Sequence, residues 1–275
     1  SACPTSDFSY EEYLAALERM IRYIIDGDIY IANMTRRIHV KSRIDPYEFF
    51  CRLRRENPSP FGAYLDYGHA QIICASPERF LLLKDGLVST RPIKGTRPRG
   101  KTPPEDEALR QELIDSEKDR SELLMIVDLE RNDLSRVCEL DSVEVTELFA
   151  LEEYATVFHL VSTVKGRLAS DNDVCDLLES AFPGGSITGA PKHRAIQIID
   201  ELENSARGLY TGSIGYIGLD GSCDMNIVIR TAVFDGSSYE IGVGGGITAE
   251  SDVIAEYDET SQKAKALLSA LEALR

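Results

Sequence analysis

The chain has 275 residues, of which 43% are hydrophobic, and 30 Lys and Arg against 46 Asp and Glu give it a formal net charge of −16 at pH 7. This charge argues against nucleic acid or an anionic membrane as the main partner, although a local cationic pocket can still bind a small anion. The six cysteines show no CxxC spacing, so neither a zinc site nor a small disulfide framework is expected. Without a membrane-length apolar run or a signal peptide, the sequence favours a cytoplasmic protein with reduced thiols.

The predicted elements alternate irregularly between helices and strands. Ser9 and Glu12 form a capping box that begins a helix, and Gly27 ends it. Further elements are a strand at 29–40, a helix from Asp45-Pro46 to about Glu56, short strands between 60 and 96, helical patterns over about 104–136, strands near 142–149 and 156–167, helices at 173–181 and 191–205, strands at 211–219, 223–234 and 238–247, and a last helix at 252–273. Such mixed blocks predict an α+β protein with large, mostly antiparallel sheets.

Two pairs of carboxylates recur at helical spacing. Asp119 and Glu122 are three residues apart, and so are Glu256 and Glu259. Residues at this spacing share a helix face. Oxygen ligands of this kind suit Mg²⁺, which keeps several waters and takes one or two direct carboxylates. The alternative is that these side chains are solvated, with Glu259 pairing to Lys263 on the surface.

Two glycine-rich stretches can bring backbone N–H groups close to a ligand. PGGSITGAPK (183–192) precedes a helix, and GVGGGIT (242–248) follows a strand. Neither matches a P-loop or a dinucleotide-binding fingerprint. A tight turn is the alternative interpretation of each.

Several polar residues interrupt apolar segments. His159 lies in ATVFHLVSTV, Arg230 in MNIVIRTAVF and Glu78 in ASPERFLLL, while Tyr210 precedes a strand. A buried cation needs a carboxylate from the protein or from a ligand. A buried glutamate is a candidate acid, or else the partner of an arginine such as Arg79. His159 is equally compatible with a core position.

The segment RPIKGTRPRG (91–100) is the most basic part of this acidic chain. It contains Lys94 and the arginines Arg91, Arg97 and Arg99. Taken alone, it can be a solvated turn or can contain a reactive amine.

Taken together, these motifs resemble the chorismate-utilising enzyme family. The resemblance rests on GDIYIANMT, NPSPF, ASPERFL, RPIKGTRPRG, SEKDRSELLMIVDLERNDLSRV, HLVSTVKG, PGGSITGAPK, RGLYTGSIGY, IVIRTAVF, GVGGGIT and EYDET, in the family's order over about 9–273. It implies two large antiparallel sheets stacked as a sandwich with helices outside. It also implies a single chorismate-binding catalytic domain over 1–275, without the N-terminal domain that relatives usually carry and in which tryptophan binds.

The resemblance also implies roles for individual residues. Glu122 and Glu259 match direct Mg²⁺ ligands, and Asp119 and Glu256 match positions that hold metal-bound waters. Glu78 matches the general acid or base beside C4 of the substrate ring. Contacts with chorismate are implied for His159, Thr188, Tyr210, Arg230, Gly244, Gly246 and Lys263.

Lys94 distinguishes between reactions within the family. Anthranilate synthases carry Ala at this position, whereas the lysine form is similar to aminodeoxychorismate synthases. There the amine attacks C2 of chorismate, and ammonia then gives 4-amino-4-deoxychorismate for p-aminobenzoate and folate synthesis. The three arginines and desolvation are expected to favour the neutral amine.

Other features leave alternatives open. Ile31 stands where amine-using relatives have Gln and water-using relatives have Lys. No glutamine amidotransferase segment is recognisable, so ammonia is expected from solution or from a partner amidotransferase subunit. Anthranilate synthase and a non-catalytic chorismate-binding or subunit-interaction module remain the competing functions.

Overall fold

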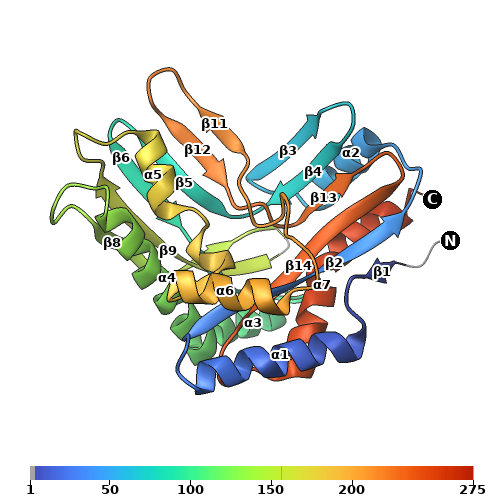
Figure 1. Ribbon diagram of the computed structural model, residues 1–275. Helices are drawn as coiled ribbons and strands as arrows, with labels where there is room; N and C mark the ends of the chain where they lie inside the picture. Colours follow the sequence, from blue (N-terminus) through green and yellow to red (C-terminus); the bar gives the residue numbers. More distant parts are fainter. Residues whose placement is uncertain (1–3, 156, 275) are drawn as a thin grey trace. The chain divides into compact units, whose positions relative to one another are not determined.

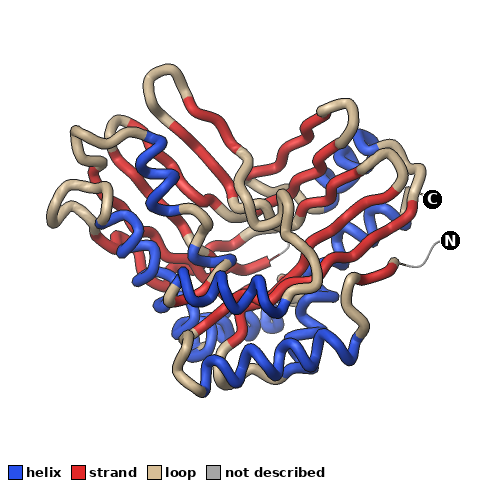
Figure 2. Tube along the Cα trace, viewed as in Figure 1, coloured by secondary structure: helices blue, strands red, loops and turns tan. Residues whose placement is uncertain are grey.

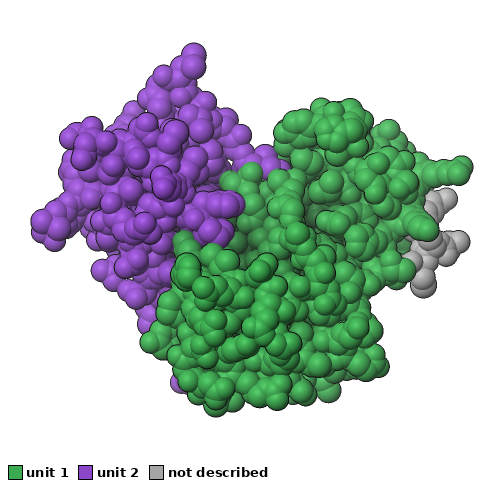
Figure 3. Space-filling model, in the orientation of Figure 1, with its two compact units in different colours: residues 1–77, 187–213, 226–275 green, residues 78–186, 214–225 purple. Residues whose placement is uncertain are grey.

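The computed structural model describes residues 4–155 and 157–274. The chain forms two compact units, each built around one sheet. Unit 1 comprises residues 1–77, 187–213 and 226–275, and unit 2 comprises residues 78–186 and 214–225 (Figure 3).

The sheet of unit 1 has seven strands in the order β1-β2-β14-β13-β4-β3, with β10 also paired to β2 (Figure 1). Their bounds are β1 Thr5–Ser6, β2 Ile31–Lys41, β3 Phe61–Asp66, β4 Gln71–Ser76, β10 Gly189–Ala190, β13 Thr231–Phe234 and β14 Ser238–Ile247. β14 runs antiparallel to β2 along its whole length, from Ser238 opposite Lys41 to Ile247 opposite Ala32. This ladder fixes which side chains of the two strands share a face.

Four helices of unit 1 pack on the apolar face of this sheet. They are α1 Tyr10–Ile25, α2 Pro46–Glu56, α6 Lys192–Leu202 and α7 Val253–Glu272. Successive side chains of a strand point to opposite faces. Ala32 and Met34 of β2 join the core formed by α1 and α6, and Ile38 joins the core formed by α2 and α7. The intervening Thr35 and Arg37 therefore lie on the other face, and both are buried.

The sheet of unit 2 also has seven strands, in the order β11-β12-β5-β6-β9-β7, with β8 paired to β9. Their bounds are β5 Arg79–Lys84, β6 Leu87–Arg91, β7 Ile93–Pro98, β8 Glu144–Glu153, β9 Val157–Arg167, β11 Gly215–Ile217 and β12 Cys223–Asn226. The helices are α3 Pro103–Asp115, α4 Glu117–Ser135 and α5 Val174–Ala181, with a 3₁₀ turn η1 at Gly185–Ile187. α4 packs against β7, β8 and β9. Figure 2 shows the helices in blue and the strands in red.

The structure confirms the α+β class and the two antiparallel sheets, and it corrects one predicted element. The helical patterns over 104–136 form two helices, because Ser116 leaves the helical conformation and its Oγ caps α4 by accepting from Asp119 N at 3.3 Å. The strand expected at 223–234 is two strands in different sheets. Between them lies Arg230, whose φ of 50° is incompatible with a continuous strand.

Candidate active site

Lys94 lies at a bulge in β7. Opposite β9, Lys94 pairs with Leu160 and Thr96 pairs with His159, so Gly95 is an extra residue with a φ of 79°. Such a bulge redirects the neighbouring side chains and is frequent beside active sites. The half-buried Lys94 donates from Nζ to the carbonyl oxygen of Ser186 at 3.3 Å. The amine is therefore oriented by the first half of the PGGSITGAPK segment.

Gly95 is the contact point between β7 and the helices α3 and α4. A Cβ at this residue would lie 2.7 Å from Leu113 Cδ1 and 2.9 Å from Asp119 Cγ. Both the positive φ and this close approach require glycine. The lysine and the first carboxylate pair are thus connected through one glycine.

The arginines around Lys94 are all ion-paired with carboxylates of unit 2. The pairs are Arg91 with Glu147 and Glu152, Arg97 with Glu112 and Asp119, and Arg99 with Asp106. The N···O separations lie between 2.5 and 3.2 Å. Carboxylates of the same unit therefore balance the charge of each of these arginines.

Glu78 and His159 belong to the same sheet as Lys94. Glu78 is 5% exposed and immediately precedes β5. In the antiparallel ladder of β5 and β6, Arg79 stands opposite Arg91. Arg79 forms a bidentate ion pair with Asp224, at 3.0 and 3.1 Å. His159 is 7% exposed, and its Nδ1 lies 2.9 Å from Thr96 Oγ1. The sheet of unit 2 thus carries the imidazole and the amine on neighbouring strands, and the buried carboxyl group immediately precedes one of its strands.

The carboxylate pair of unit 2 lies in the first turns of α4. Glu122 is 7% exposed, and Lys118 Nζ is 3.9 Å from it. Asp119 accepts from Arg97 Nη2 at 3.2 Å. The positive end of the helix dipole favours anionic side chains here.

The carboxylate pair of unit 1 lies on α7, above the glycines of β14. A Cβ on Gly245 would stand 3.2 Å from Glu256 Oε2 and 3.6 Å from Glu259 Oε1, so both carboxylates turn toward one point. Lys263 Nζ contacts Glu259 Oε1 at 2.5 Å and donates to Gly244 O at 2.8 Å. Oxygen donors that converge over the glycine run of β14 fit a hard cation such as Mg²⁺. Within either unit, the described residues contain no cluster of three or more acidic, histidine or cysteine ligands.

The second half of β14 has an open edge. β13 pairs only with Tyr239–Ile241, and no ladder among the described residues covers Gly242–Ile247 on that side. Gly244 and Gly246 lie opposite Thr35 and Asn33 of β2. Their backbone groups thus lie along the part of β14 that β13 leaves unpaired, where Gly244 is buried and Gly246 is partly buried.

The remaining predicted contacts, Thr188, Tyr210 and Arg230, belong to unit 1. Thr188 is 3% exposed, and its carbonyl oxygen accepts from Asn33 N at 2.7 Å. The Tyr210 ring packs against β14, because a Cβ on Gly242 would lie 2.2 Å from its Cγ. Burial raises the pKa of Tyr210 to about 12, although neighbouring arginines oppose this shift, so its hydroxyl is a proton donor at neutral pH. The Arg230 carbonyl oxygen accepts from Ala75 N at 3.1 Å.

Sequence reasoning missed a hydrogen-bonded group of charged residues in the same unit. Arg207 Nη2 donates to Glu203 Oε1 at 2.7 Å, Thr35 Oγ1 donates to the same oxygen, and Arg37 Nη1 donates to Thr35 Oγ1. Its one local signal is the pair Arg36-Arg37 inside an apolar strand.

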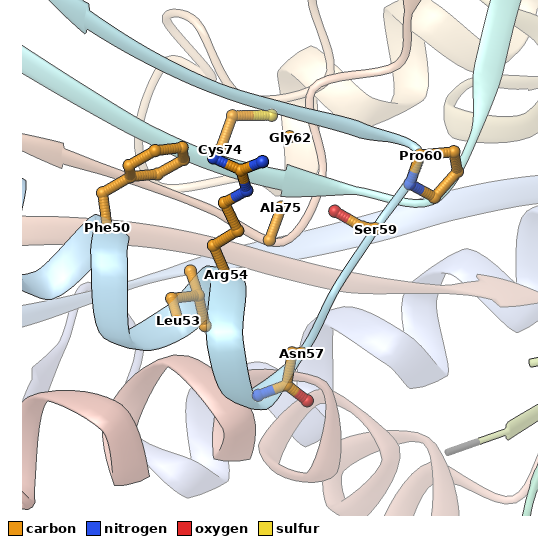
Figure 4. A pocket seen from close by; sticks show the side chains of 9 residues that line it. All are labelled: Phe50, Leu53, Arg54, Asn57, Ser59, Pro60, Gly62, Cys74 and Ala75. Carbon is orange, nitrogen blue, oxygen red and sulfur yellow. The ribbon is translucent and has the colours of Figure 1, made fainter. Parts of the chain in front are cut away.

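A cavity of about 300 Å³ lies elsewhere in unit 1 (Figure 4). Its lining comprises Phe50, Leu53, Arg54, Asn57, Ser59, Pro60, Gly62, Cys74 and Ala75. None of these is a predicted site residue, so this cavity is separate from the candidate active-site residues of unit 1.

Two further expectations concern the cysteines and the membrane. The described cysteines, at 51, 74, 138, 175 and 223, are free thiols. Among the described residues, no helix combines the length and apolar character needed to cross a bilayer.

Comparisons with known proteins agree with the predicted family. Residues 4–269 match the family model described as chorismate binding enzyme. The chain is 48% identical to an aminodeoxychorismate synthase of Streptomyces pristinaespiralis, over 96% of the chain and 37% of the relative. It is 45% identical to an anthranilate synthase component 1 of Haloarcula marismortui, over 97% of the chain and 55% of the relative. The crystal structure of anthranilate synthase component I from Streptococcus pneumoniae superposes with a TM-score of 0.89 at 36% identity, over 96% of the chain and 59% of that structure. The chain therefore spans only about a third to three fifths of the length of these relatives.

Proposed function

Because the chain belongs to the family of chorismate binding enzymes, we propose that it aminates chorismate to 4-amino-4-deoxychorismate, a precursor of p-aminobenzoate and folate. The observation that supports this reaction most directly is Lys94, which stands at a bulge with its amine oriented by the Ser186 carbonyl. An alkyl amine in this position is a nucleophile once it is neutral. The 48% identity to an aminodeoxychorismate synthase supports the same reaction.

The proposed reaction has two substitutions. The Lys94 lone pair forms a C–N bond at C2, the ring double bonds shift, and the C4–O bond breaks. Glu78 protonates the departing oxygen, which leaves as water, since hydroxide is a poor leaving group. Ammonia then attacks C4, the double bonds shift back, and the C2–N bond breaks to restore the Lys94 amine. Proton loss from the new ammonium group completes the cycle.

Binding of the substrate carboxylates is assigned to the residues of unit 1 and to magnesium. Tyr210, Arg230 and the backbone at Gly244 and Gly246 are the proposed contacts of the enolpyruvyl carboxylate. Thr188, Lys263 and His159 are the proposed contacts of the remainder of chorismate. Glu122 and Glu259 would bind Mg²⁺, with Asp119 and Glu256 holding its waters. Bound there, the cation supplies positive charge to the C1 carboxylate.

Ammonia is proposed to come from glutamine through a partner amidotransferase subunit. Relatives named component 1 support a two-component organisation. We therefore expect ammonium salts to replace glutamine when the chain is assayed alone.

The test is identification of the product. Purified protein is mixed with chorismate, MgCl₂ and an ammonium salt, and the products are separated and identified by mass spectrometry. We expect 4-amino-4-deoxychorismate from the wild type. Lys94→Ala should lose at least about a hundredfold in rate, as for a catalytic group, whereas the exposed Lys101→Ala should keep the wild-type rate.

Anthranilate synthase is the second candidate, and the 45% identity to such an enzyme favours it. Fluorescent anthranilate as the main product would establish that activity and overturn our proposal. Chorismate binding without turnover, even with ammonium, would instead favour a non-catalytic module.

A further inference from the structure

Arg37 is a buried cation on the face of the unit 1 sheet opposite the helices. Its neighbour Arg36 points to the helices, where Nε donates to Thr260 Oγ1 at 2.9 Å and Nη2 donates to Ser261 Oγ at 3.0 Å. Arg37 pairs across the ladder with Gly242 of β14. The two arginines are thus adjacent in sequence but serve different faces of one strand.

The hydrogen bonding of Arg37 is incomplete. The residue is 1% exposed, and its Nη1 donates to Thr35 Oγ1 at 3.2 Å. Within residues 4–155 and 157–274, no acceptor lies within hydrogen-bonding distance of its Nε or Nη2. A guanidinium has five donors, and burying it with so few partners costs free energy. Arg37 is therefore not explained by its own contribution to stability.

Glu203, which Thr35 connects to Arg37 through hydrogen bonds, is already balanced by another arginine. Glu203 has a 6% exposed side chain and accepts from Arg207 Nε at 3.0 Å and from Nη2 at 2.7 Å. It also accepts from Thr35 N and Oγ1. Arg37 Nε lies 3.9 Å from Glu240 Oε1, and the Glu240 side chain is 45% exposed and thus screened by solvent. The positive charge of Arg37 is therefore not balanced by a buried carboxylate of its own among the residues that the structure describes.

This charge lies directly beside Tyr210. The Arg37 guanidinium carbon is 4.9 Å from the centroid of the Tyr210 ring, a cation–π contact. The same ring packs on Gly242, which leaves no room for a side chain. The tyrosine is thus held between a guanidinium and the backbone of β14, with its hydroxyl protonated at neutral pH.

We propose that Arg37 is a positioning residue that fixes the Tyr210 ring and supplies positive charge behind it, which strengthens binding of the substrate carboxylate at the Tyr210 hydroxyl. Arg37 acts through the tyrosine and does not touch the substrate. This inference rests on the proposed function, in which Tyr210 contacts the enolpyruvyl carboxylate. It also accounts for a buried arginine whose Nε and Nη2 have no hydrogen-bond partner among the described residues.

The experiment measures the dissociation constant of chorismate by calorimetry, with MgCl₂ and without ammonium. Arg37→Met keeps the aliphatic length and removes the charge, and it should raise the Kd about tenfold or more. Arg37→Lys should recover part of the affinity, because charge returns without the planar stacking. Arg36→Met is the matched control: it should lower the melting temperature while leaving the Kd at the wild-type value.

Two further measurements separate positioning from general damage. In a Tyr210→Phe background, Arg37→Met should change the Kd by about threefold or less, because the coupled group is gone. A chorismate analogue with a hydroxyl in place of the enolpyruvyl group should bind wild type and Arg37→Met equally. Equal loss for both ligands, or additive effects in the double variant, would overturn the proposal. If Arg37→Met does not fold, Arg37→Lys replaces it in the test. A wild-type Kd of Arg37→Lys for chorismate would then overturn the proposal. If wild type does not bind chorismate, the proposed function itself fails.

Discussion

At the scale of single residues, Glu78 and Lys94 divide the proposed chemistry between an acid and a nucleophile. Glu78 is buried at the start of β5, and Lys94 is half-buried on β7. A carboxyl group that must donate a proton benefits from burial, because low polarity disfavours its charged form. The proposed acid is thus a buried side chain, and the proposed nucleophile is a half-buried one.

Replacing Glu78 by Gln should lower kcat by roughly 10²–10⁴-fold, as expected when a general acid is lost. The amide preserves the shape of the side chain, so the melting temperature and the Kd for chorismate should change little. Steady-state rates with ammonium, together with thermal unfolding, measure both effects. A variant with wild-type kcat would exclude Glu78 as the acid.

The sequence motifs suggest roles for these two residues, but they do not predict the contacts around them. The motif order named Lys94, but the carboxylates that balance its arginines lie far along the chain, such as Glu147 and Glu152 for Arg91. Contacts of that kind depend on how β8 pairs with β9 and leave no local signal. Arg37 was missed for the same reason. Its two informative neighbours, the Tyr210 ring and Gly242 on β14, lie far from it in the sequence.

At the scale of elements, the bulge in β7 connects the nucleophile to α4. Gly95→Ala introduces a Cβ into Leu113 and Asp119 at a positive φ. We expect a loss of roughly 1–3 kcal/mol in the free energy of unfolding and a lower kcat, because Lys94 shifts with the strand. Gly86→Ala is the control. Gly86 also has a positive φ, of 74°, but a Cβ added there would lie 3.5 Å from its nearest neighbour, Arg167 Nη1.

Gly86→Ala should therefore lose only the cost of an unfavourable φ, about 1 kcal/mol, and keep wild-type kcat. Denaturant unfolding and steady-state rates distinguish the two glycines. Equal destabilisation with unchanged kcat in both variants would show that the bulge has no part in orienting the amine.

The turn that begins β14 gives a prediction about pH. Asp235 Oδ1 accepts from Ser237 N at 2.8 Å and from Ser238 N at 2.7 Å, and these bonds lower the pKa of Asp235 to about 2. A carboxyl group with a depressed folded-state pKa stabilises the protein above its unfolded pKa, near 3.8. That contribution is lost as the pH falls toward 2.

Asp235→Asn keeps the shape but removes the charge, so it should destabilise the protein at pH 7 by about 1 kcal/mol or less. The difference from wild type should stay constant between pH 7 and 5 and narrow toward pH 3. Urea unfolding at these three pH values measures it. A difference that is the same at pH 3 and pH 7 would contradict the assigned role of the carboxylate.

Other elements show which features can be predicted locally. The capping box at Ser9 and Glu12 forms as the sequence predicts, and β14 spans the predicted residues 238–247. The division of 223–234 into two strands was not predictable from its apolar pattern. β12 and β13 both contain buried residues, but they belong to different sheets. Periodicity reports burial, and it does not report which sheet a strand joins.

At the scale of the whole molecule, each unit has one helix that carries a pair of acidic residues at a spacing of three. α4 carries Asp119 and Glu122, and α7 carries Glu256 and Glu259. Oxygen-only donors of this kind select Mg²⁺ over softer metals. Activity should therefore disappear with EDTA and return with added MgCl₂.

Glu122→Gln and Glu259→Gln should each raise the MgCl₂ concentration needed for half-maximal rate by about tenfold or more. The exposed Glu117→Gln on α4 and Asp258→Asn on α7 are matched controls that should leave this requirement unchanged. Magnesium titrations of the ammonium-dependent rate give all four values. An unchanged requirement in Glu259→Gln would remove that residue from the proposed ligands.

The central claim, covalent catalysis by Lys94, is tested most directly by intact mass spectrometry of the protein incubated with chorismate and MgCl₂ without ammonium. We predict an added mass equal to chorismate minus one water, located by peptide mapping on Lys94 and removed when ammonium is supplied. Lys94→Ala should show no such adduct. A wild-type protein that turns over chorismate with ammonium but forms no adduct, or an adduct that persists in Lys94→Ala, would contradict the claim.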